Sequence, residues 1–160
     1  MDIRFAKPQD VDGIISLLRQ VGQVHREGRP DIFRAGAQKY SPEQVLCLLS
    51  SPDKPIFIAA EGDLVLGYGF CQLKAYQNDP VIADHKTLYI DDLCVDENCR
   101  GKSVGKKLYQ EICRYAKQQG CYNVTLNVWS CNPTAMRFYE KLGLMPQKIG
   151  MEQVLDAEEK

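Results

Sequence analysis

The chain has 160 residues, of which 44% are hydrophobic and 26% are charged, and its formal net charge is −1. These values indicate a single globular domain over residues 1–160 with a sizeable core, and the charge argues against a dedicated nucleic-acid-binding protein. No apolar run approaches the ~18 residues of a membrane span, and the first residues lack the basic and apolar regions of a signal peptide. Seven cysteines, an odd number without a C-x2-C pair, predict reduced thiols in the cytoplasm and no metal site.

The predicted elements begin with a short strand at residues 2–6, followed by a helix with an apolar stripe at Val11, Ile14, Ile15, Leu18 and Val21. Residues 25–40 are irregular. A second helix starts at Ser41, the N-cap, and turns Val45, Leu46 and Leu49 inward.

Strands follow at residues 56–60 and 64–74, joined by a hairpin turn at residues 61–63, and again at residues 87–95. A long helix then ends at Gly120, and a strand at residues 122–128 precedes a short helix at residues 133–142 that Gly143 closes. The tail through Leu155 suggests one or two final strands. This order predicts an α/β class with a mixed sheet flanked by helices.

The segment at residues 96–109, DENCRGKSVGKKLY, lies between a strand and the long helix. Such a junction offers unpaired backbone N–H groups and the positive end of a helix dipole, which favour phosphate. Between residues 100 and 117 there are six basic residues and one acid, Glu111. The spacing is neither the Walker nor the dinucleotide motif, and a solvated connection is the alternative.

Two motifs resemble the GNAT superfamily of acyl-CoA-dependent N-acyltransferases. The loop from Arg100 to Gly105 is similar to the family's pyrophosphate loop, Gln/Arg-x-x-Gly-x-Gly/Ala. The segment from Asn132 to Leu144 is similar to the family's Asn-x3-Ala-x2-Phe-Tyr-x3-Gly-Phe segment. The first motif departs from the family at Ser103, where a glycine is usual and where serine tolerates fewer backbone conformations.

The resemblance implies a mixed, mostly antiparallel sheet of about 6–7 strands with about four helices, splayed between the strands at residues 87–95 and 122–128. It implies an enzyme that moves an acetyl group from acetyl-CoA to a primary amine of a small molecule, such as a polyamine, amino acid or aminoglycoside-like compound, and releases CoA. The alternatives are acetylation of a protein N-terminus or lysine, and a non-catalytic acyl-CoA-binding module. Dimers are common in the family, so a homodimer is a further expectation.

The family's cofactor site is carried over to three parts of this chain. Backbone groups of Leu93, Cys94 and Val95, opposite residues 125–127, hold the pantetheine arm. The loop that holds the pyrophosphate consists of Arg100, Gly101, Lys102, Ser103, Val104, Gly105 and Lys106. Asn132 bonds cofactor amides or caps the helix that Pro133 opens, and both roles are compatible.

Tyr139 falls where the family commonly has its general acid. A phenol has a pKa of about 10, so it is neutral at pH 7 and can protonate a departing thiolate. The alternative is an aromatic side chain that only packs.

The run from Tyr89 to Val95 resembles the Leu-Glu-Asp-Leu/Phe run of diamine acetyltransferases in this superfamily. Asp91 matches the Glu that helps to deprotonate the amine, and Asp92 follows it. Neighbours on a strand point to opposite faces, so only one of these acids is expected to face the cleft. Six carboxylates lie within residues 79–97 against one fixed positive charge, which favours a cationic acceptor. The alternative is a β-bulge or an acid pair at the surface.

The irregular segment between the first two helices corresponds to the connection that lines the acceptor pocket in the family. We expect Arg29 and Phe33 to bind substrate there, although a solvated loop is the alternative. His25 is expected to be structural rather than catalytic.

Overall fold

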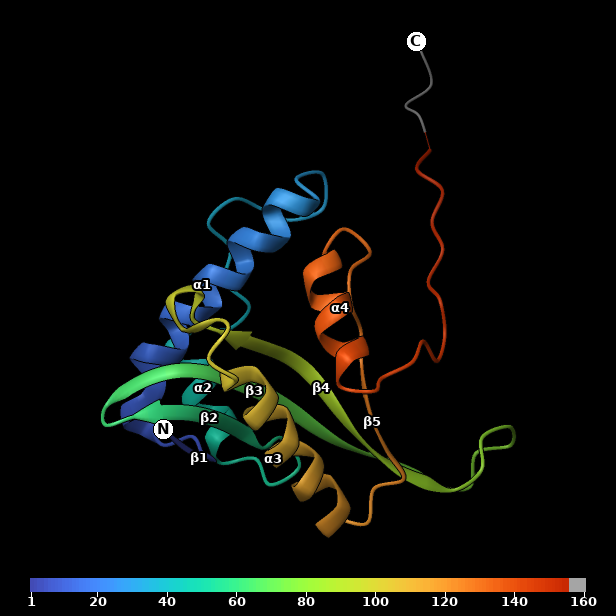
Figure 1. Cartoon of the computed structure of the whole chain (residues 1–160). Helices are drawn as coiled ribbons and strands as arrows, with labels where there is room; N and C mark the ends of the chain where they lie inside the picture. The colour runs from blue at the N-terminus through green and yellow to red at the C-terminus, as the bar shows by residue number, and fades with distance from the viewer. Residues whose placement is uncertain (156–160) are drawn as a thin grey trace.

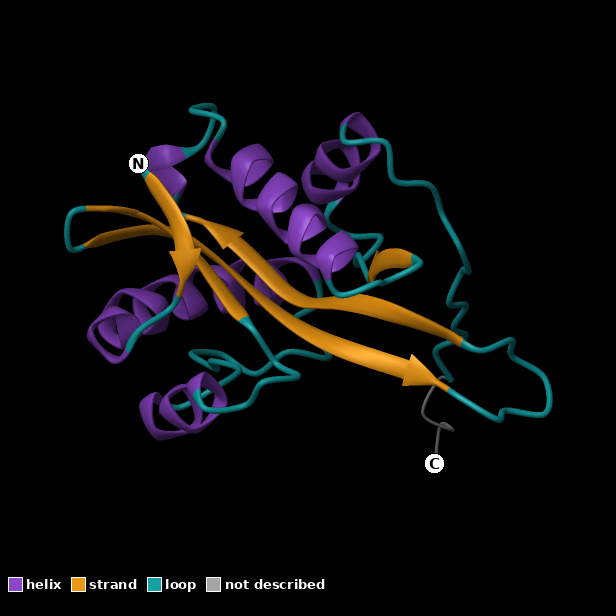
Figure 2. Ribbon diagram, turned by 90° about the horizontal axis from the view of Figure 1, so that it is seen from below, coloured by secondary structure: helices purple, strands orange, loops and turns teal. Residues whose placement is uncertain are grey.

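The computed structural model describes residues 1–155 and contains a five-stranded sheet covered by helices on both faces (Figure 1 and Figure 2). In chain order the elements are β1 (Asp2–Phe5), the 3-10 turn η1 (Pro8–Asp10), α1 (Val11–Gly28), α2 (Pro42–Leu49), β2 (Ile56–Glu61), β3 (Leu64–Tyr76), β4 (His85–Val95), the 3-10 turn η2 (Glu97–Cys99), α3 (Val104–Gln118), β5 (Asn123–Leu126) and α4 (Pro133–Lys141).

The strands follow the chain, in the order β1-β2-β3-β4-β5. The first four pair antiparallel with their neighbours, and β5 pairs parallel with β4. The predicted class, the mixed and mostly antiparallel sheet and the four flanking helices are therefore confirmed. The number of strands is lower than expected, five among the described residues rather than six or seven.

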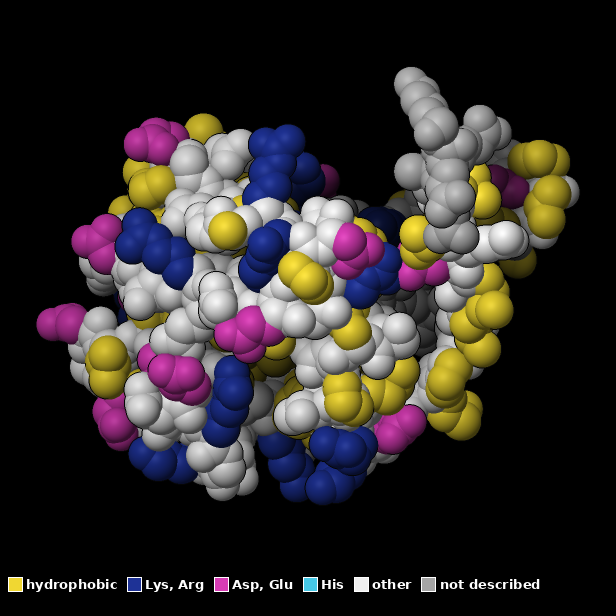
Figure 3. Space-filling model, turned by 90° about the horizontal axis from the view of Figure 1, so that it is seen from above, with side chains coloured by type: hydrophobic (Ala, Val, Ile, Leu, Met, Phe, Trp, Pro, Cys, Tyr) yellow, Lys and Arg dark blue, Asp and Glu magenta, His cyan; other side chains and the backbone are white. Residues whose placement is uncertain are grey.

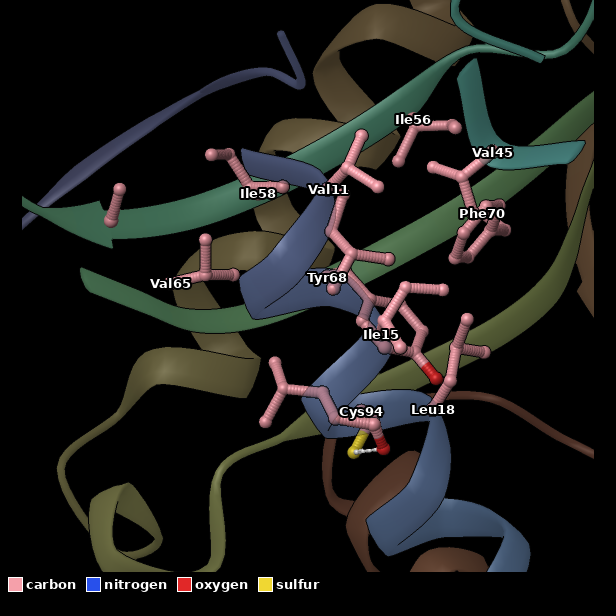
Figure 4. Close-up of a cluster of buried hydrophobic side chains, with 13 residues drawn as sticks. Val11, Ile15, Leu18, Val45, Ile56, Ile58, Val65, Tyr68, Phe70 and Cys94 are labelled. Atoms are coloured by element: carbon pink, nitrogen blue, oxygen red, sulfur yellow. Dashed lines mark hydrogen bonds between the residues drawn. The ribbon is translucent and has the colours of Figure 1, made fainter. Parts of the chain in front are cut away.

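One face of the sheet packs against α1, whose apolar stripe is buried as the sequence predicts (Figure 4). Ile14 and Leu18 are fully buried against side chains such as Ile58 and Tyr68 of β2 and β3. Burial of side chains of this size stabilises the fold by about 1.5–3 kcal/mol each. This packing fixes the orientation of α1 on the sheet, and therefore the place where the irregular segment after it begins.

Helix α2 joins the same face and begins as expected. The Ser41 side chain accepts a hydrogen bond from the backbone amide of Gln44, and the Gln44 side chain accepts one from the backbone amide of Ser41. Val45 is fully buried, but Leu46 is 44% exposed, so the prediction that Leu46 points inward is wrong. The helix spans only eight residues and meets the core along a single narrow face.

The opposite face of the sheet packs against α3. Leu108 and Ile112 are fully buried there against Phe57, Leu88 and neighbouring side chains. Helix α3 thereby has a fixed position relative to β4, and the loop before it reaches one end of the sheet (Figure 1).

Strands β4 and β5 separate part of the way along, which confirms the predicted splay. Their pairing runs from Thr87–Asn123 to Ile90–Leu126 and stops there, although β4 continues to Val95. The edge of β4 beyond Ile90 that would face β5 therefore has no strand partner within residues 1–155.

The tail after α4 forms no strand, so the prediction of one or two final strands is wrong for the residues that the structure describes. Residues 145–155 are drawn out and leave the body beside α4 (Figure 1). Met145, Ile149 and Met151 are 84%, 78% and 87% exposed. A strand needs a neighbour for its backbone hydrogen bonds, and the tail meets none within residues 1–155. None of the helices in that part of the chain is both long and apolar enough to span a membrane.

Candidate active site

The loop between β4 and α3 presents backbone amides at a helix start. Gly101 and Ser103 both have left-handed backbones, with φ of 78° and 61°. Ser103 is the N-cap of α3, but its side chain accepts no capping bond, and the first turn holds no acidic residue. The first amides of α3 are therefore available to an anion in front of the helix.

Basic side chains surround this helix start. Arg100, Lys102 and Lys106 are exposed, and Lys106 lies in the first turn, where a positive charge opposes the helix dipole. An anion held at these amides would reverse that unfavourable interaction. Open amides and exposed cations suit a pyrophosphate, so the residues of this loop fit the phosphate groups of acetyl-CoA.

Gly105 has a second role that the sequence did not reveal. A Cβ placed there would lie 3.0 Å from Cζ of Phe138 and 3.3 Å from Cγ2 of Val95. The glycine therefore allows α3, α4 and β4 to approach one another closely. The motif spacing alone predicted a phosphate contact and gave no sign of this packing.

Leu93, Cys94 and Val95 lie on the part of β4 beyond the last pair with β5. They pair with β3 on their other side, so one edge of this segment stays open for backbone hydrogen bonds. The Cys94 side chain itself points into the core, where its thiol approaches the Leu17 carbonyl (Figure 4). Burial raises the pKa of Cys94 to about 12, which excludes a reactive thiolate at neutral pH.

Tyr139 lies on α4 and is half-buried, with its ring 5.0 Å from that of Phe138. Burial raises the pKa of its hydroxyl well above the usual range, and the nearby Asp92 carboxylate and Cys94 thiol add to the effect. No hydrogen bond contributes to this shift. Tyr139 is therefore a protonated phenol near the open part of β4, as a proton donor should be.

Asn132 starts the helix that carries Tyr139. Its side-chain oxygen accepts a hydrogen bond of 3.1 Å from the Ala135 amide, which makes it the N-cap of α4. The capping role is confirmed. Its contact with cofactor amides remains a prediction.

The two neighbouring acids of β4 face the same side of the sheet, and the prediction that only one does so is wrong. The register shifts between Phe70 and Cys71, which pair with Asp92 and Ile90, so Asp91 is the extra residue of a β-bulge. Asp91 reaches Tyr40, whose ring packs on Phe70. Asp92 reaches Tyr68, which lies beside Phe70 on β3.

Arg29 and Phe33 lie in the segment after α1, as expected, but the Arg29 side chain is held by ion pairs and the Phe33 side chain is not. Arg29 forms ion pairs with Asp31 and with Glu152 of the tail. Phe33 stacks on His25 with ring centroids 5.0 Å apart. The Phe33 ring is therefore better placed than the Arg29 guanidinium to meet a substrate.

Trp129 completes this aromatic group and was missed by the sequence reasoning. Its ring lies edge-on to Phe33 at 5.2 Å, so it connects the segment after β5 with the end of α1. It is 41% exposed. The signal available in the sequence was that the single tryptophan of the chain stands three residues before Asn132.

A sheet that opens between β4 and β5, next to a helix start whose amides are available to an anion, fits the fold of an acyl-CoA-dependent transferase. The model of the acetyltransferase (GNAT) family matches residues 21–144, and the chain belongs to this family. It is an N-acetyltransferase.

Two curated relatives cover most of the chain. It is 29% identical to a glucosamine 6-phosphate N-acetyltransferase of Arabidopsis thaliana, over 90% of this chain and 89% of the relative. It is 27% identical to a thialysine N-epsilon-acetyltransferase of Bos taurus, over 88% and 82%.

Solved structures agree. A tetramutant of the BH1408 protein from Bacillus halodurans is 32% identical and superposes with a TM-score of 0.92, over 97% of this chain and 100% of that one. An aminoglycoside acetyltransferase from a soil metagenomic sample, at 19% identity and a TM-score of 0.73 over 97% and 96%, shares the fold.

Proposed function

We propose that this enzyme transfers the acetyl group of acetyl-CoA to the primary amine of a small, positively charged molecule. The observation that carries the proposal is the pair of carboxylates, Asp91 and Asp92, on the open end of β4, close to the protonated Tyr139. A cationic amine and a proton donor for the leaving thiolate would meet there.

The cofactor contacts follow from the fold. The loop from Arg100 to Lys106 would hold the pyrophosphate through its amides and cations, and the open edge of Leu93, Cys94 and Val95 would bond the pantetheine arm. Asn132 would hold cofactor amides while it caps α4. Bound acetyl-CoA supplies an acetyl group activated as a thioester. Tyr139 would donate its proton toward the sulfur, and an acid of β4 would take the proton of the amine.

The charges near the acceptor side favour a cationic amine over a phosphorylated sugar. Asp92 forms no ion pair within residues 1–155, and its carboxylate would repel a phosphate group. Two basic residues of this region are already engaged, since Lys39 pairs with Asp91 and Arg29 pairs with Asp31. The relatives of this chain include enzymes named for both kinds of acceptor, and these contacts support the amine of the thialysine type.

An amine panel with acetyl-CoA, followed by release of free CoA thiol, tests the proposal. The panel contains diamines, polyamines, thialysine, an aminoglycoside, glucosamine 6-phosphate and a lysine-containing peptide. We expect turnover with the cationic small amines. Turnover with the sugar phosphate or the peptide alone would contradict the acceptor class, and CoA binding without turnover of any amine would favour a binding module.

We propose a homodimer as the working form, built from the tail. Ile149, Met151 and Leu155 of the tail are 78%, 87% and 81% exposed, while Glu152 bonds Arg29. Hydrophobic side chains gather on the side of the molecule where the chain ends (Figure 3). The outer edge of β5 has no strand partner within residues 1–155, so the tail of a second copy could pair there.

Light scattering of the full chain tests this assembly. The double substitution Ile149→Asp and Met151→Asp should convert a dimer to a monomer. Val81→Asp is the matched control, because Val81 is 89% exposed on the β3–β4 loop and should leave the mass unchanged. A monomeric wild type at high micromolar concentration would contradict the dimer.

We place the enzyme in the cytoplasm. All seven cysteines are free, which suits a reducing compartment.

A further inference from the structure

The bulge at Asp91 gives β4 two carboxylates on one face, each held by a tyrosine from a different element. The Tyr40 hydroxyl, from the segment before α2, donates to Oδ2 of Asp91 at 2.7 Å. The Tyr68 hydroxyl, from β3, donates to Oδ2 of Asp92 at 2.8 Å. The two acids therefore have similar hydrogen bonds, and their other contacts must distinguish them.

Asp91 is already neutralised. The Lys39 ammonium lies 2.9 Å from its Oδ2 and also bonds its backbone carbonyl at 3.1 Å. Lys39 and Tyr40 both contact Oδ2, and Oδ1 of Asp91, like that of Asp92, accepts no bond from the described residues. The countercharge of Lys39 is therefore what distinguishes Asp91 from Asp92. The negative charge of Asp91 serves mainly to hold the segment before α2 against the bulge.

Asp92 keeps an oxygen available. Tyr68 bonds its Oδ2, and no buried side-chain oxygen within residues 1–155 lacks a partner. Oδ1 accepts no bond from the described residues, and burial raises the pKa of the Asp92 carboxyl, while the Tyr68 hydroxyl and the Lys39 ammonium oppose this rise. The charged and titratable groups around the carboxylate are Lys39, His25, Asp91, Tyr40, Cys94 and Tyr139.

Tyr68 is rigid. Its side chain is fully buried in the core beneath α1, and its ring packs edge to face with that of Phe70, with the ring centroids 5.0 Å apart (Figure 4). Its hydroxyl therefore has a fixed position, and its single proton is committed to Asp92. A hydrogen bond from a rigid donor fixes the rotamer of the acid and favours its charged form.

We infer that Tyr68 is a positioning residue, which holds Asp92 so that the free Oδ1 binds the acceptor ammonium and accepts its proton. This inference rests on the proposed function and deepens it, because it assigns the amine site to Asp92 rather than to Asp91. The N–H bond of the ammonium breaks, the nitrogen keeps the electron pair, and the proton passes to Oδ1 and then to solvent. The neutral amine can then attack the thioester.

The test compares Tyr68→Phe with Tyr40→Phe, since each removes one hydroxyl from one of the two acids and keeps the ring. For Tyr68→Phe we expect an amine KM raised tenfold or more. We also expect the acidic limb of kcat/KM to move up by about one pH unit, because the carboxylate loses the donor that favours its charged form. Tyr40→Phe should change KM less than twofold and leave the limb in place.

Asp92→Asn supplies the second measurement. In the Asp92→Asn background, Tyr68→Phe should cause no further loss, because the positioned charge is already absent. CoA binding by calorimetry identifies folded variants, and a Tyr68→Phe protein that does not bind CoA is replaced by Tyr68→Leu with the same readouts. Equal effects of the two tyrosine variants, a larger effect of Tyr40→Phe, or additive losses would overturn the inference. A wild type that acetylates no amine would instead overturn the proposed function.

Discussion

Replacing Tyr139 with phenylalanine should separate the chemistry of this enzyme from its fold. The ring keeps its contact with Phe138, at 5.0 Å, and only the hydroxyl is lost. Because no hydrogen bond contributes to the pKa shift of Tyr139, the free energy of unfolding should change by less than about 1 kcal/mol. Loss of a general acid should lower kcat by roughly 10²–10⁴, which corresponds to about 2.7–5.5 kcal/mol in the barrier.

The pKa of Tyr139 adds a second expectation. Burial raises that pKa, so the phenol keeps its proton up to at least pH 10. Ionisation of Tyr139 should therefore cause no decline in the wild-type rate below pH 10. Proton donation must occur as the thiolate leaves, because a free phenolate in this buried position would be costly.

Single-turnover thiol release gives the rate of the chemical step directly. Tyr109→Phe is the matched control, because Tyr109 is a half-buried tyrosine on α3 near Tyr139, and burial raises its pKa as well. The control should retain the wild-type rate. A Tyr139→Phe enzyme with near wild-type single-turnover rate would refute the general-acid role and leave Tyr139 as a packing residue.

Three further substitutions test the cofactor loop, the packing of its helix and the ion pair before α1. Ser103→Gly removes a left-handed serine without losing a cap, so stability should stay equal or rise by up to about 1 kcal/mol, and calorimetry should find CoA binding preserved; tenfold weaker binding would mean that the serine side chain contacts the cofactor. Gly105→Ala forces a methyl group against Phe138 and should cost about 1–3 kcal/mol in urea unfolding and slow turnover, because α4 must shift; unchanged stability and rate would contradict the close packing. Asp10→Asn removes a carboxylate that is 3% exposed and bonded to Arg4 at 2.8 Å. Burial alone would raise the pKa of Asp10, but the Arg4 guanidinium and a backbone amide hold it below the usual range. The stability that the Asp10 carboxylate gives to the fold is therefore present above its unfolded pKa of about 3.9, and it is lost as the pH falls through the lower folded pKa. Urea unfolding should find the variant about 1–3 kcal/mol less stable at pH 7 and close to the wild type at pH 2; an equal gap at both pH values would contradict this linkage.

Features that depend on a few adjacent residues could be predicted from the sequence. Ser41 and Pro42 determine the start of α2, and Gly62, with φ of 59°, allows the hairpin turn between β2 and β3. Gly143, whose backbone is left-handed, follows the C-cap of α4 and stops the helix. Each of these positions is decided by the conformational preference of one or two residues, so no knowledge of distant contacts is needed.

Features decided by contacts between distant segments could not be predicted. The bulge at Asp91 could be offered from the sequence only as an alternative, because it depends on the register between β3 and β4, and it reverses the expected direction of one acid. The partner of Gly105 is Phe138, more than 30 residues further on. The tail looked like a strand because of its apolar residues, but a strand also requires a neighbour, and the sequence of one chain does not provide that neighbour.

The same distinction separates the two halves of the active site. The loop from Arg100 to Lys106 is continuous in the sequence, so a motif can identify it and the fold needs only to leave its amides open. The acceptor side that we propose would be assembled from Phe33 after α1, Tyr68 on β3, Asp92 on β4 and Trp129 after β5. Each of these residues can change without disturbing the cofactor loop. Acceptor choice can therefore diverge among chains that keep one fold and one cofactor, and in the site that we propose for this chain it would depend on which carboxylate of β4 remains free of a lysine.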